Sequence, residues 1–199
     1  MSALLGLSRL IDWLNEHIGK ITAWAILIAV VVSAGNAIIR KVFGTSSNAW
    51  LELQWYLFGA VFMLCAAWTL KENEHIRIDI VAGRLSKRAR DWIEIVGHVF
   101  FLFPFVAVMI WLTWPFFWRS YLSGEVSTNA GGLIIWPAKL LVLVGFVVLA
   151  LQWASELIKR VAVMRGVIED PYASAGSDAE RALAEMAAPP PPPPGGDPR

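Results

Sequence analysis

Apolar residues along this chain gather into four long runs separated by polar segments. No charged residue interrupts residues 21–39, 53–70 or 95–118, and the run 133–155 contains only Lys139, near its start. About twenty apolar residues, each rising about 1.5 Å in a helix, cross the roughly 30 Å hydrocarbon core of a bilayer. The pattern therefore predicts an all-α integral membrane protein with four transmembrane helices, at about 21–39, 51–70, 93–117 and 133–157.

The segment before the first run has a different pattern. Its apolar residues recur at helical spacing, and most of its polar residues fall off that stripe. Arg9, Asp12 and Glu16 interrupt any apolar core and no positively charged start precedes them, which argues against a secretory signal peptide. We expect residues 1–20 to form an amphipathic helix that lies in the membrane interface before the chain turns into the first span. The apolar stripe consists of Leu7, Leu10, Ile11, Leu14 and Ile18.

Lys and Arg residues flank the runs unevenly, and their distribution predicts the orientation. Positive residues beside membrane spans stay on the cytoplasmic side. Most of them lie in the N-terminal segment, the 71–91 loop and the segment after the fourth run, so both termini are expected inside. The majority side has Arg9, Lys20, Lys71, Arg77, Arg84, Lys87, Arg88, Arg90, Lys159, Arg160 and Arg165; the other side has Arg40, Lys41, Arg119 and Lys139.

Composition supports a membrane protein and limits the chemistry. The chain is 57% hydrophobic and 17% charged, whereas soluble domains average about 25% charged residues. The single cysteine, Cys65, lies inside the second run and excludes a disulfide framework or a Cys-rich metal site. Residues 166–199 end in a proline tract, which adopts an extended conformation and joins no packed core. This stretch is expected to be a disordered, Pro-rich cytoplasmic tail.

The 71–91 segment is expected to lie along the cytoplasmic surface, because isoleucines alternate with charged residues and an amphipathic pattern follows. His75 and Asp79 stand four residues apart and invite a comparison with metal ligands. Zinc and transition-metal sites need three or four ligands, however, and no second histidine or cysteine is nearby. We interpret the pair as part of a polar turn that docks against a neighbouring chain.

The centres of the four spans contain no charged residue. Coupled transporters usually place ionisable residues near mid-membrane, where they mark the ion path. We therefore expect no catalytic, substrate-binding or metal-ligating residue, no cofactor and no enzyme activity. Alternatives remain open: a stand-alone or homodimeric transporter, a membrane redox protein that uses the embedded His98, or an adaptor that uses its proline-rich tail.

Four short stretches in a fixed order resemble a known family. They are "NAIIRKVFG" after the first span, "WLELQW" opening the second, "KENEHIRIDI" after it and "WPAK" before the fourth. Over roughly residues 10–165 the chain resembles the small membrane subunit (DctQ-type) of the tripartite ATP-independent periplasmic (TRAP) transporters. Many members of that family have a second acidic residue beside the position of Glu52, where this chain has Leu53 and Gln54.

The resemblance implies a bacterial inner-membrane protein that works with a large multi-span permease subunit and a periplasmic substrate-binding protein. The large subunit would contain the sodium and substrate sites for organic acid (carboxylate) uptake, and this chain would scaffold it without catalysing transport. It also singles out candidate contacts with the large subunit or with membrane lipids. These candidates are Arg40, Glu52, Trp55, His75 and Asp79.

Overall fold

The computed structural model describes residues 2–72 and 87–169, and this part of the chain is helical. Its only β feature is an isolated antiparallel bridge between Val126 and Ile134. Four helical stretches are long and apolar enough to cross a membrane, which confirms the predicted fold class. The elements are α1 (Ser2–Phe43), α2 (Asn48–Lys71), α4 (Lys87–Gly97), the π-helix η1 (His98–Leu102), α5 (Phe103–Ser123) and α6 (Trp136–Met164).

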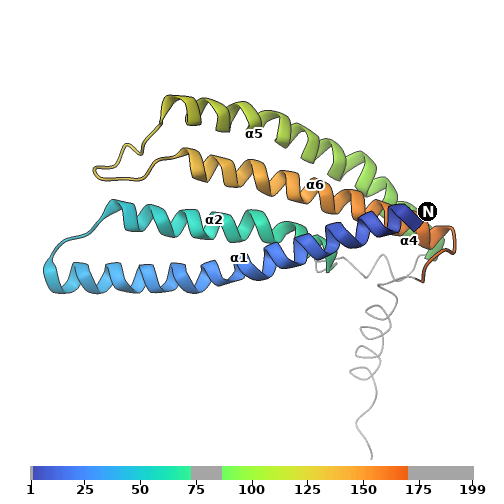
Figure 1. The fold of residues 1–199 in the computed structure, drawn as a ribbon, viewed down its shortest axis with the longest axis horizontal. Coiled ribbons are helices and arrows are strands. Elements are labelled where there is room, and N and C mark those ends of the chain that lie inside the picture. The colour runs from blue at the N-terminus through green and yellow to red at the C-terminus, as the bar shows by residue number, and fades with distance from the viewer. Residues whose placement is uncertain (1, 73–86, 170–199) are drawn as a thin grey trace, which may run out of the picture.

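The long helices form an open layer (Figure 1). Helices α1 and α2 make one antiparallel hairpin, α5 and α6 make a second, and α2 packs against α6 to join them. Helix α1 crosses to reach α6 near the N-terminus. We call the end that contains the N-terminus and α4 the terminal end, and the end that contains the connections 44–47 and 124–135 the loop end.

Helix α1 is continuous from Ser2 to Phe43, without the expected turn between residues 1–20 and the first span. Its sequence contains no proline that would break it. Gly19 lies in the middle, but it is buried where a Cβ atom would come within 2.6 Å of Trp68 Cε3, so it allows close packing on α2. Whether residues 1–20 lie in the membrane interface stays a prediction.

Helix ends follow local sequence signals. Gly44 after α1 and Gly124 after α5 have φ angles of 65° and 60°, a left-handed conformation that glycine adopts without strain. Pro137 stands in the first turn of α6, a position that suits its fixed φ and missing N–H. As a result α6 begins at Trp136, and residues 133–135, assigned from sequence to the fourth span, lie in the preceding loop.

The third membrane stretch contains a π-helical turn just before Pro104. Proline has no N–H, and its ring crowds the carbonyl four residues earlier, at Phe100. The backbone accommodates it through η1, and the N–H of Phe103 donates to the carbonyl of His98. The same carbonyl accepts a 2.8 Å hydrogen bond from Trp153 Nε1 on α6. The π-helical turn is thereby fastened to the neighbouring helix.

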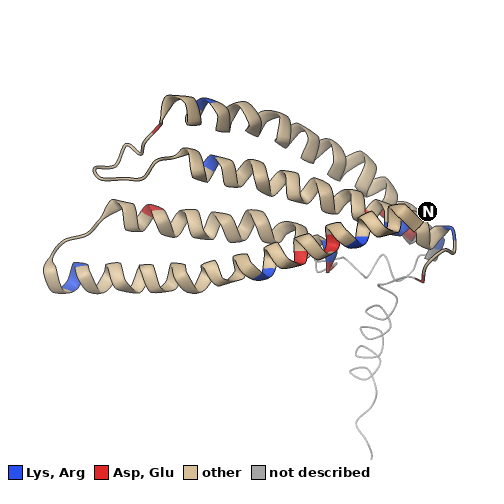
Figure 2. Ribbon diagram, in the orientation of Figure 1, with Lys and Arg blue, Asp and Glu red and all other residues tan. Residues whose placement is uncertain are grey.

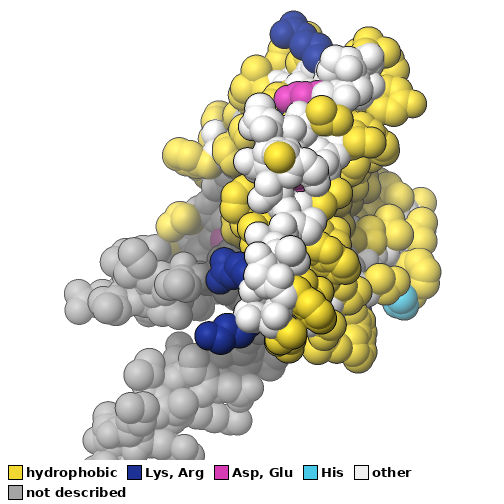
Figure 3. Space-filling view, turned by 90° about the vertical axis from the view of Figure 1, so that its left-hand side faces the viewer, with side chains coloured by type: hydrophobic (Ala, Val, Ile, Leu, Met, Phe, Trp, Pro, Cys, Tyr) yellow, Lys and Arg dark blue, Asp and Glu magenta, His cyan; other side chains and the backbone are white. Residues whose placement is uncertain are grey.

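Small residues bring the central helices together, and large ones face outward. At Gly145 on α6 a Cβ atom would lie 2.7 Å from Met63 Cβ and 2.9 Å from the Met63 carbonyl oxygen, so α6 and α2 approach closely. Many large apolar side chains remain exposed on all four long helices. Figure 3, which views the loop end, shows hydrophobic side chains over much of the described surface. This exposure is expected of helices that lipid or a partner surrounds.

Candidate functional site

Charged residues of the described chain concentrate toward the two ends of the layer, and the stretches 21–39, 53–70, 95–118 and 140–155 contain none (Figure 2). Each end also contains a network of buried polar side chains. We call the network at the terminal end the α1–α6 cluster and the one at the loop end the loop clamp. The α1–α6 cluster consists of Ser8, Asp12, Asn15, Gln152, Ser155, Glu156 and Lys159.

Helical spacing builds the α1–α6 cluster. Ser8, Asp12 and Asn15 stand at positions i, i+4 and i+7 of α1 and share one face, which turns toward α6. The side chains of Ser8 and Asn15 are almost fully buried. On the outward sides of the same segment, Leu7 and Leu10 are 49% and 60% exposed. The N-terminal part of α1 therefore packs into the protein through its polar face together with Ile11, which is buried.

Gln152 on α6 joins the members of the α1–α6 cluster. Its Oε1 accepts a 2.7 Å hydrogen bond from Asn15 Nδ2, and its Nε2 donates to Asp12 Oδ1 at 2.9 Å and to Glu156 Oε1 at 2.8 Å. Lys159 Nζ lies 2.5 Å from Glu156 Oε1 and 3.1 Å from Asp12 Oδ2, and so neutralises part of the buried charge. Such a network fixes one register between two helices because most of its polar groups find partners only in that register.

Two hydroxyl groups extend this network. Ser155 Oγ donates to Asp12 Oδ1 at 2.7 Å and lies 2.7 Å from Ser8 Oγ. Both serines are at most 1% exposed. Asp12 thus contacts three residues of α6, Gln152, Ser155 and Lys159. If one of these contacts is lost, the other two still stabilise its carboxylate.

Two ion-pair groups connect further helices at the terminal end. Glu16 on α1 pairs with Lys20 on the same helix and with Lys71 at the end of α2, each at 2.5 Å. Arg160 on α6 pairs with Asp91 at 3.3 Å and with Glu94, both on α4. The second group holds the start of the third membrane stretch against α6.

The loop clamp is built from one face of α2. Asn48, Glu52 and Tyr56 stand at i, i+4 and i+8, and all three contact the loop that precedes α6. Asn48 Nδ2 donates to the Ala130 carbonyl at 2.9 Å, and Tyr56 Oη donates to the Ile134 carbonyl at 3.0 Å. Side chains of a helix thus hold the backbone of a distant loop.

Glu52 is the centre of the loop clamp. Its carboxylate accepts hydrogen bonds from the Ser127 hydroxyl, from Asn129 Nδ2 at 2.8 Å and from the backbone N–H of Leu133 at 2.6 Å. The residue is 5% exposed and has no ion-pair partner among the described residues. Gly132 makes room for it, because a Cβ there would lie 2.5 Å from Ser127 Cβ and 2.8 Å from Glu52 Oε1.

The candidate interface residues differ in their exposure, and two of them lie outside the described residues. Arg40 and Trp55 are exposed, Trp55 to 70%, so both are accessible to a partner or to lipid. Glu52 is turned inward and holds the 127–133 loop of its own chain. His75 and Asp79, with the other residues of 73–86, lie outside the described residues, as does the tail from residue 170 onward.

Sequence reasoning missed both networks. A signal was present, because Ser8–Asp12–Asn15 and Asn48–Glu52–Tyr56 each repeat a polar side chain at helical spacing. A polar glutamine, Gln152, also interrupts an otherwise apolar run, where such a residue needs a partner. The spacing predicts a face but does not identify which helix or loop meets it.

These arrangements connect helices and loops within the chain. Within residues 2–72 and 87–169, no three His, Cys, Asp or Glu side chains gather where they could hold a metal ion. His98, the candidate for a redox role, stands in η1, and its carbonyl oxygen accepts hydrogen bonds from Phe103 and Trp153. What the geometry offers is a braced helical layer with broad apolar faces.

Comparison with known proteins identifies the family. No curated protein and no solved structure matches the chain. Residues 28–163, which contain α2, α5, the last part of α1 from residue 28 and nearly all of α6, match the family described as "Tripartite ATP-independent periplasmic transporters, DctQ component". This match confirms the resemblance seen in the sequence, and the open layer of four membrane-length helices fits it. The chain therefore belongs to the DctQ family, the small membrane component of TRAP transporters.

Proposed function

We propose that this chain is the non-catalytic scaffold of a sodium-coupled TRAP transporter for organic acids. In this role it braces the large permease subunit in the inner membrane, and a periplasmic binding protein delivers the substrate. The observation that supports the proposal most directly is the open layer, in which α5 packs on α6 while large apolar side chains stay exposed on every long helix. A polypeptide that forms its own transport pathway would instead need polar groups around a central cavity.

The polar residues of the described chain support the same role. The α1–α6 cluster and the loop clamp fasten the two ends of the layer, and the charge-free middle leaves no ion path between them. Fastening both ends keeps the layer from bending when a partner moves against it. We infer that the internal polar networks give the stiffness and that the exposed apolar faces give the docking surface.

Small residues on the exposed faces suggest where a partner helix packs. Gly35 on α1 and Gly59 on α2 have no atom of the described residues within 4 Å of the place where a Cβ would stand, apart from their own helix backbone and chain neighbours. In membranes, small residues let helices approach closely, and these two serve no such contact inside the chain. We propose that the large subunit packs over them.

Orientation belongs to the same proposal. The terminal end contains the excess of Lys and Arg predicted to be cytoplasmic, so the loop end faces the periplasm and the binding protein. In this orientation the outward apolar side of residues 2–14 lies in the cytoplasmic interface. Arg40 and Trp55, exposed toward the other end, remain candidates for contact with the large subunit or with lipid.

Reconstitution tests the scaffold role. Liposomes that contain this chain alone should show no organic acid uptake under a sodium gradient, whereas the chain with its large subunit and binding protein should show uptake. The chain should also co-purify with the large subunit in mild detergent. Uptake by the isolated chain would contradict the proposal, and so would the absence of any complex.

A substitution tests the docking surface separately. Gly59→Leu should reduce co-purification with the large subunit while the chain still folds, because the added side chain meets open space within the chain. Gly6→Leu is the matched control, since Gly6 is equally open but precedes the residues that match the family. An equal effect of the two substitutions would show that Gly59 is not at the contact.

A further inference from the structure

A pocket of about 410 Å³ lies at the loop end between α5, the start of α6 and the loop that joins them. Its α5 side is formed by residues at one helical face, from Leu112 to Ser123. Lys139 of α6 and Glu125 of the loop complete it. This pocket is distinct from both the α1–α6 cluster and the loop clamp, and neither network uses its residues.

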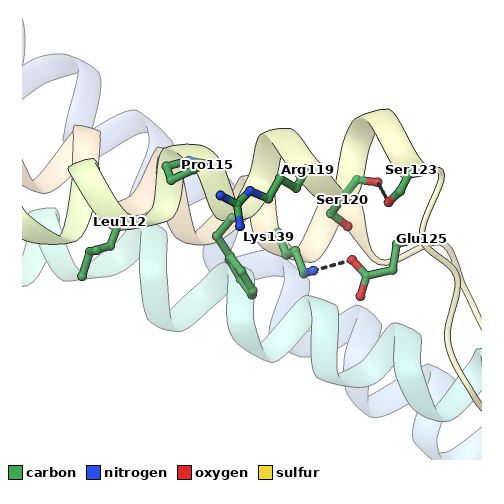
Figure 4. Close-up of a pocket in the computed structure, with 8 residues that line it drawn as sticks. Leu112, Pro115, Arg119, Ser120, Ser123, Glu125 and Lys139 are labelled. Atoms are coloured by element: carbon green, nitrogen blue, oxygen red, sulfur yellow. Dashed lines mark hydrogen bonds and ion pairs between the residues drawn. The ribbon is translucent and has the colours of Figure 1, made fainter.

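The lining of the pocket changes from apolar to polar along α5. Leu112 and Pro115 lie at one end in Figure 4, and the Lys139–Glu125 pair lies toward the other. Eleven residues of helix span about 16 Å, so the change occurs over a length similar to half a bilayer core. Such a gradient matches a molecule with an apolar chain and a charged head. A free ion would gain nothing from the apolar end.

Three charged groups line the polar end, and they leave one positive charge in excess. Lys139 Nζ pairs with Glu125 and lies 4.3 Å from the centre of the Phe116 ring. Arg119 is exposed and has no ion-pair partner within the described residues. A guanidinium group presents paired N–H donors that match a phosphate. The excess charge therefore favours an anionic group beside Arg119.

A buried donor points to the same ligand. Ser120 is 1% exposed, and its Oγ makes no hydrogen bond of full geometry among the described residues; it interacts at most weakly with the Glu125 carboxylate, which is already paired with Lys139. Buried hydroxyl groups are nearly always hydrogen-bonded, and an unmet one needs an explanation. A phosphate oxygen in the pocket would accept this hydrogen bond.

We propose that this pocket binds the phosphate group of a phospholipid in the leaflet at the loop end. Arg119 and Ser120 contact the phosphate, Lys139 adds positive charge, and the acyl chains follow Leu112, Pro115 and Phe116 along α5. Aromatic side chains beside the pocket fit this level, because Trp and Tyr prefer the headgroup region; Tyr121 packs against Trp118 and Trp136 there. The site depends on membrane insertion and not on the scaffold role.

Native mass spectrometry of the full chain tests the site. Delipidated protein is titrated with phosphatidylglycerol, and Arg119→Gln should weaken the tightest binding by about tenfold or more, as expected for a charge-assisted hydrogen bond. Arg119→Lys should restore part of the affinity. Lys41→Gln, which removes an exposed cation at the same end of the layer, should have no effect. Unchanged affinity in Arg119→Gln would overturn the proposal.

Three further measurements distinguish a bound phospholipid from other occupants: binding of a lipid without phosphate, competition by inorganic phosphate, and complex formation with the protein partners. Galactosyldiacylglycerol with the same acyl chains lacks a phosphate and should bind at least about tenfold more weakly. Inorganic phosphate should compete only weakly, and competition at lipid-like affinity would overturn the assignment to a lipid. If Arg119→Gln instead disrupts the complex with the large subunit or the binding protein and leaves lipid affinity unchanged, the pocket is a protein contact and the proposal fails. Ser120→Ala, checked for helicity by circular dichroism, should weaken lipid binding less than Arg119→Gln does.

Discussion

The α1–α6 cluster and the loop clamp fasten opposite ends of one helical layer, and they do so in different ways. In the α1–α6 cluster, two carboxylates and a lysine share charge, and Gln152 connects them through hydrogen bonds to both acids. In the loop clamp, the single carboxylate of Glu52 accepts hydrogen bonds from two side chains and one backbone N–H, and no cation of the described residues pairs with it. The first network is distributed, whereas three hydrogen bonds of the second converge on Glu52, with Asn48 and Tyr56 each adding one.

This difference teaches where the fold is sensitive to mutation. A shared network loses part of its hydrogen bonding when one member is removed, because the remaining acceptors still serve its donors. When several donors share one acceptor, removing that acceptor leaves all of them unsatisfied at once. Each buried unsatisfied group destabilises the fold. The loop end should therefore be the more fragile of the two. The predictions below test this ranking, beginning with the largest effect.

Glu52→Ala should destabilise the chain most. The substitution leaves the Ser127 hydroxyl, the Asn129 amide and the Leu133 N–H without their acceptor. We expect a loss of about 2–3 kcal/mol in the free energy of unfolding, measured by denaturant unfolding in detergent. Glu169→Ala, at an exposed glutamate beyond α6, is the matched control and should have little effect. Equal stability of the two variants would refute the central role of Glu52.

Gly132→Ala should disturb the loop clamp to a smaller extent. Its new Cβ would meet Ser127 Cβ at 2.5 Å and Glu52 Oε1 at 2.8 Å, so both side chains must move and the hydrogen bond between them must weaken. Overpacking of this kind costs about 1–3 kcal/mol. The double variant with Glu52→Ala should lose less free energy of unfolding than the two single variants lose together, because both substitutions disrupt the same contact. Full additivity would show that Gly132 acts elsewhere.

Asp12→Ala should destabilise the terminal end by about 1–2 kcal/mol, less than Glu52→Ala at the loop end. Glu156 remains to pair with Lys159 and to accept from Gln152, so most of the network survives. Denaturant unfolding measures this loss under the same conditions as for Glu52→Ala. Asp12→Ala combined with Glu156→Ala should cost more than the sum of the single changes, because Lys159 then has no carboxylate within the cluster. A larger effect for Asp12→Ala than for Glu52→Ala would reverse the proposed ranking.

The sequence predicted the fold better than it predicted these networks. Charge-free runs of membrane length are a local property, so the four spans could be read directly from residues such as 21–39 and 95–118. Glu52 could be singled out, but its inward role depends on a loop some 75–81 residues further along the chain. No local sequence pattern specifies this long-range contact. The same holds for Ser8 and Ser155, which are 147 residues apart.

The boundary between residues 1–20 and the first span shows a second limit of prediction from the sequence. The apolar stripe from Leu7 to Ile18 predicted a helix that rests on lipid; its three leucines are exposed, but Ile11 is buried. The sequence did not show that the polar face, with Asp12 and Asn15, packs against α6 and needs no break from the first span. Amphipathic spacing indicates two unlike faces, but it does not say which one meets protein.

The smallest effect concerns the Glu125–Lys139 pair, which lies outside both networks at the loop end. The hydrogen bond from Lys139 holds the pKa of the Glu125 carboxyl below its ordinary value of 4.5. A lowered pKa means that the pair's contribution is fully present above the unfolded-state pKa and is lost as the pH falls through the folded-state pKa. Lowering the pH from 7 to about 5 should therefore leave the pair intact, since a carboxylate of ordinary pKa is still ionised there.

Carbon-13 NMR of the Glu125 carboxyl measures this titration. In the unmodified chain its midpoint should lie below 4.5, and Lys139→Gln should raise the midpoint because the main cause of the shift is gone. The loop clamp should not change in that variant, since Glu52 makes no contact with Lys139 and its hydrogen bonds come from Ser127, Asn129 and Leu133. A Glu125 midpoint at or above 4.5 in the unmodified chain would show that the pair does not form. A loss of the Glu52 contacts in Lys139→Gln would show that the Glu125–Lys139 pair and the loop clamp form one network. The loop end would then be a shared network, like the α1–α6 cluster.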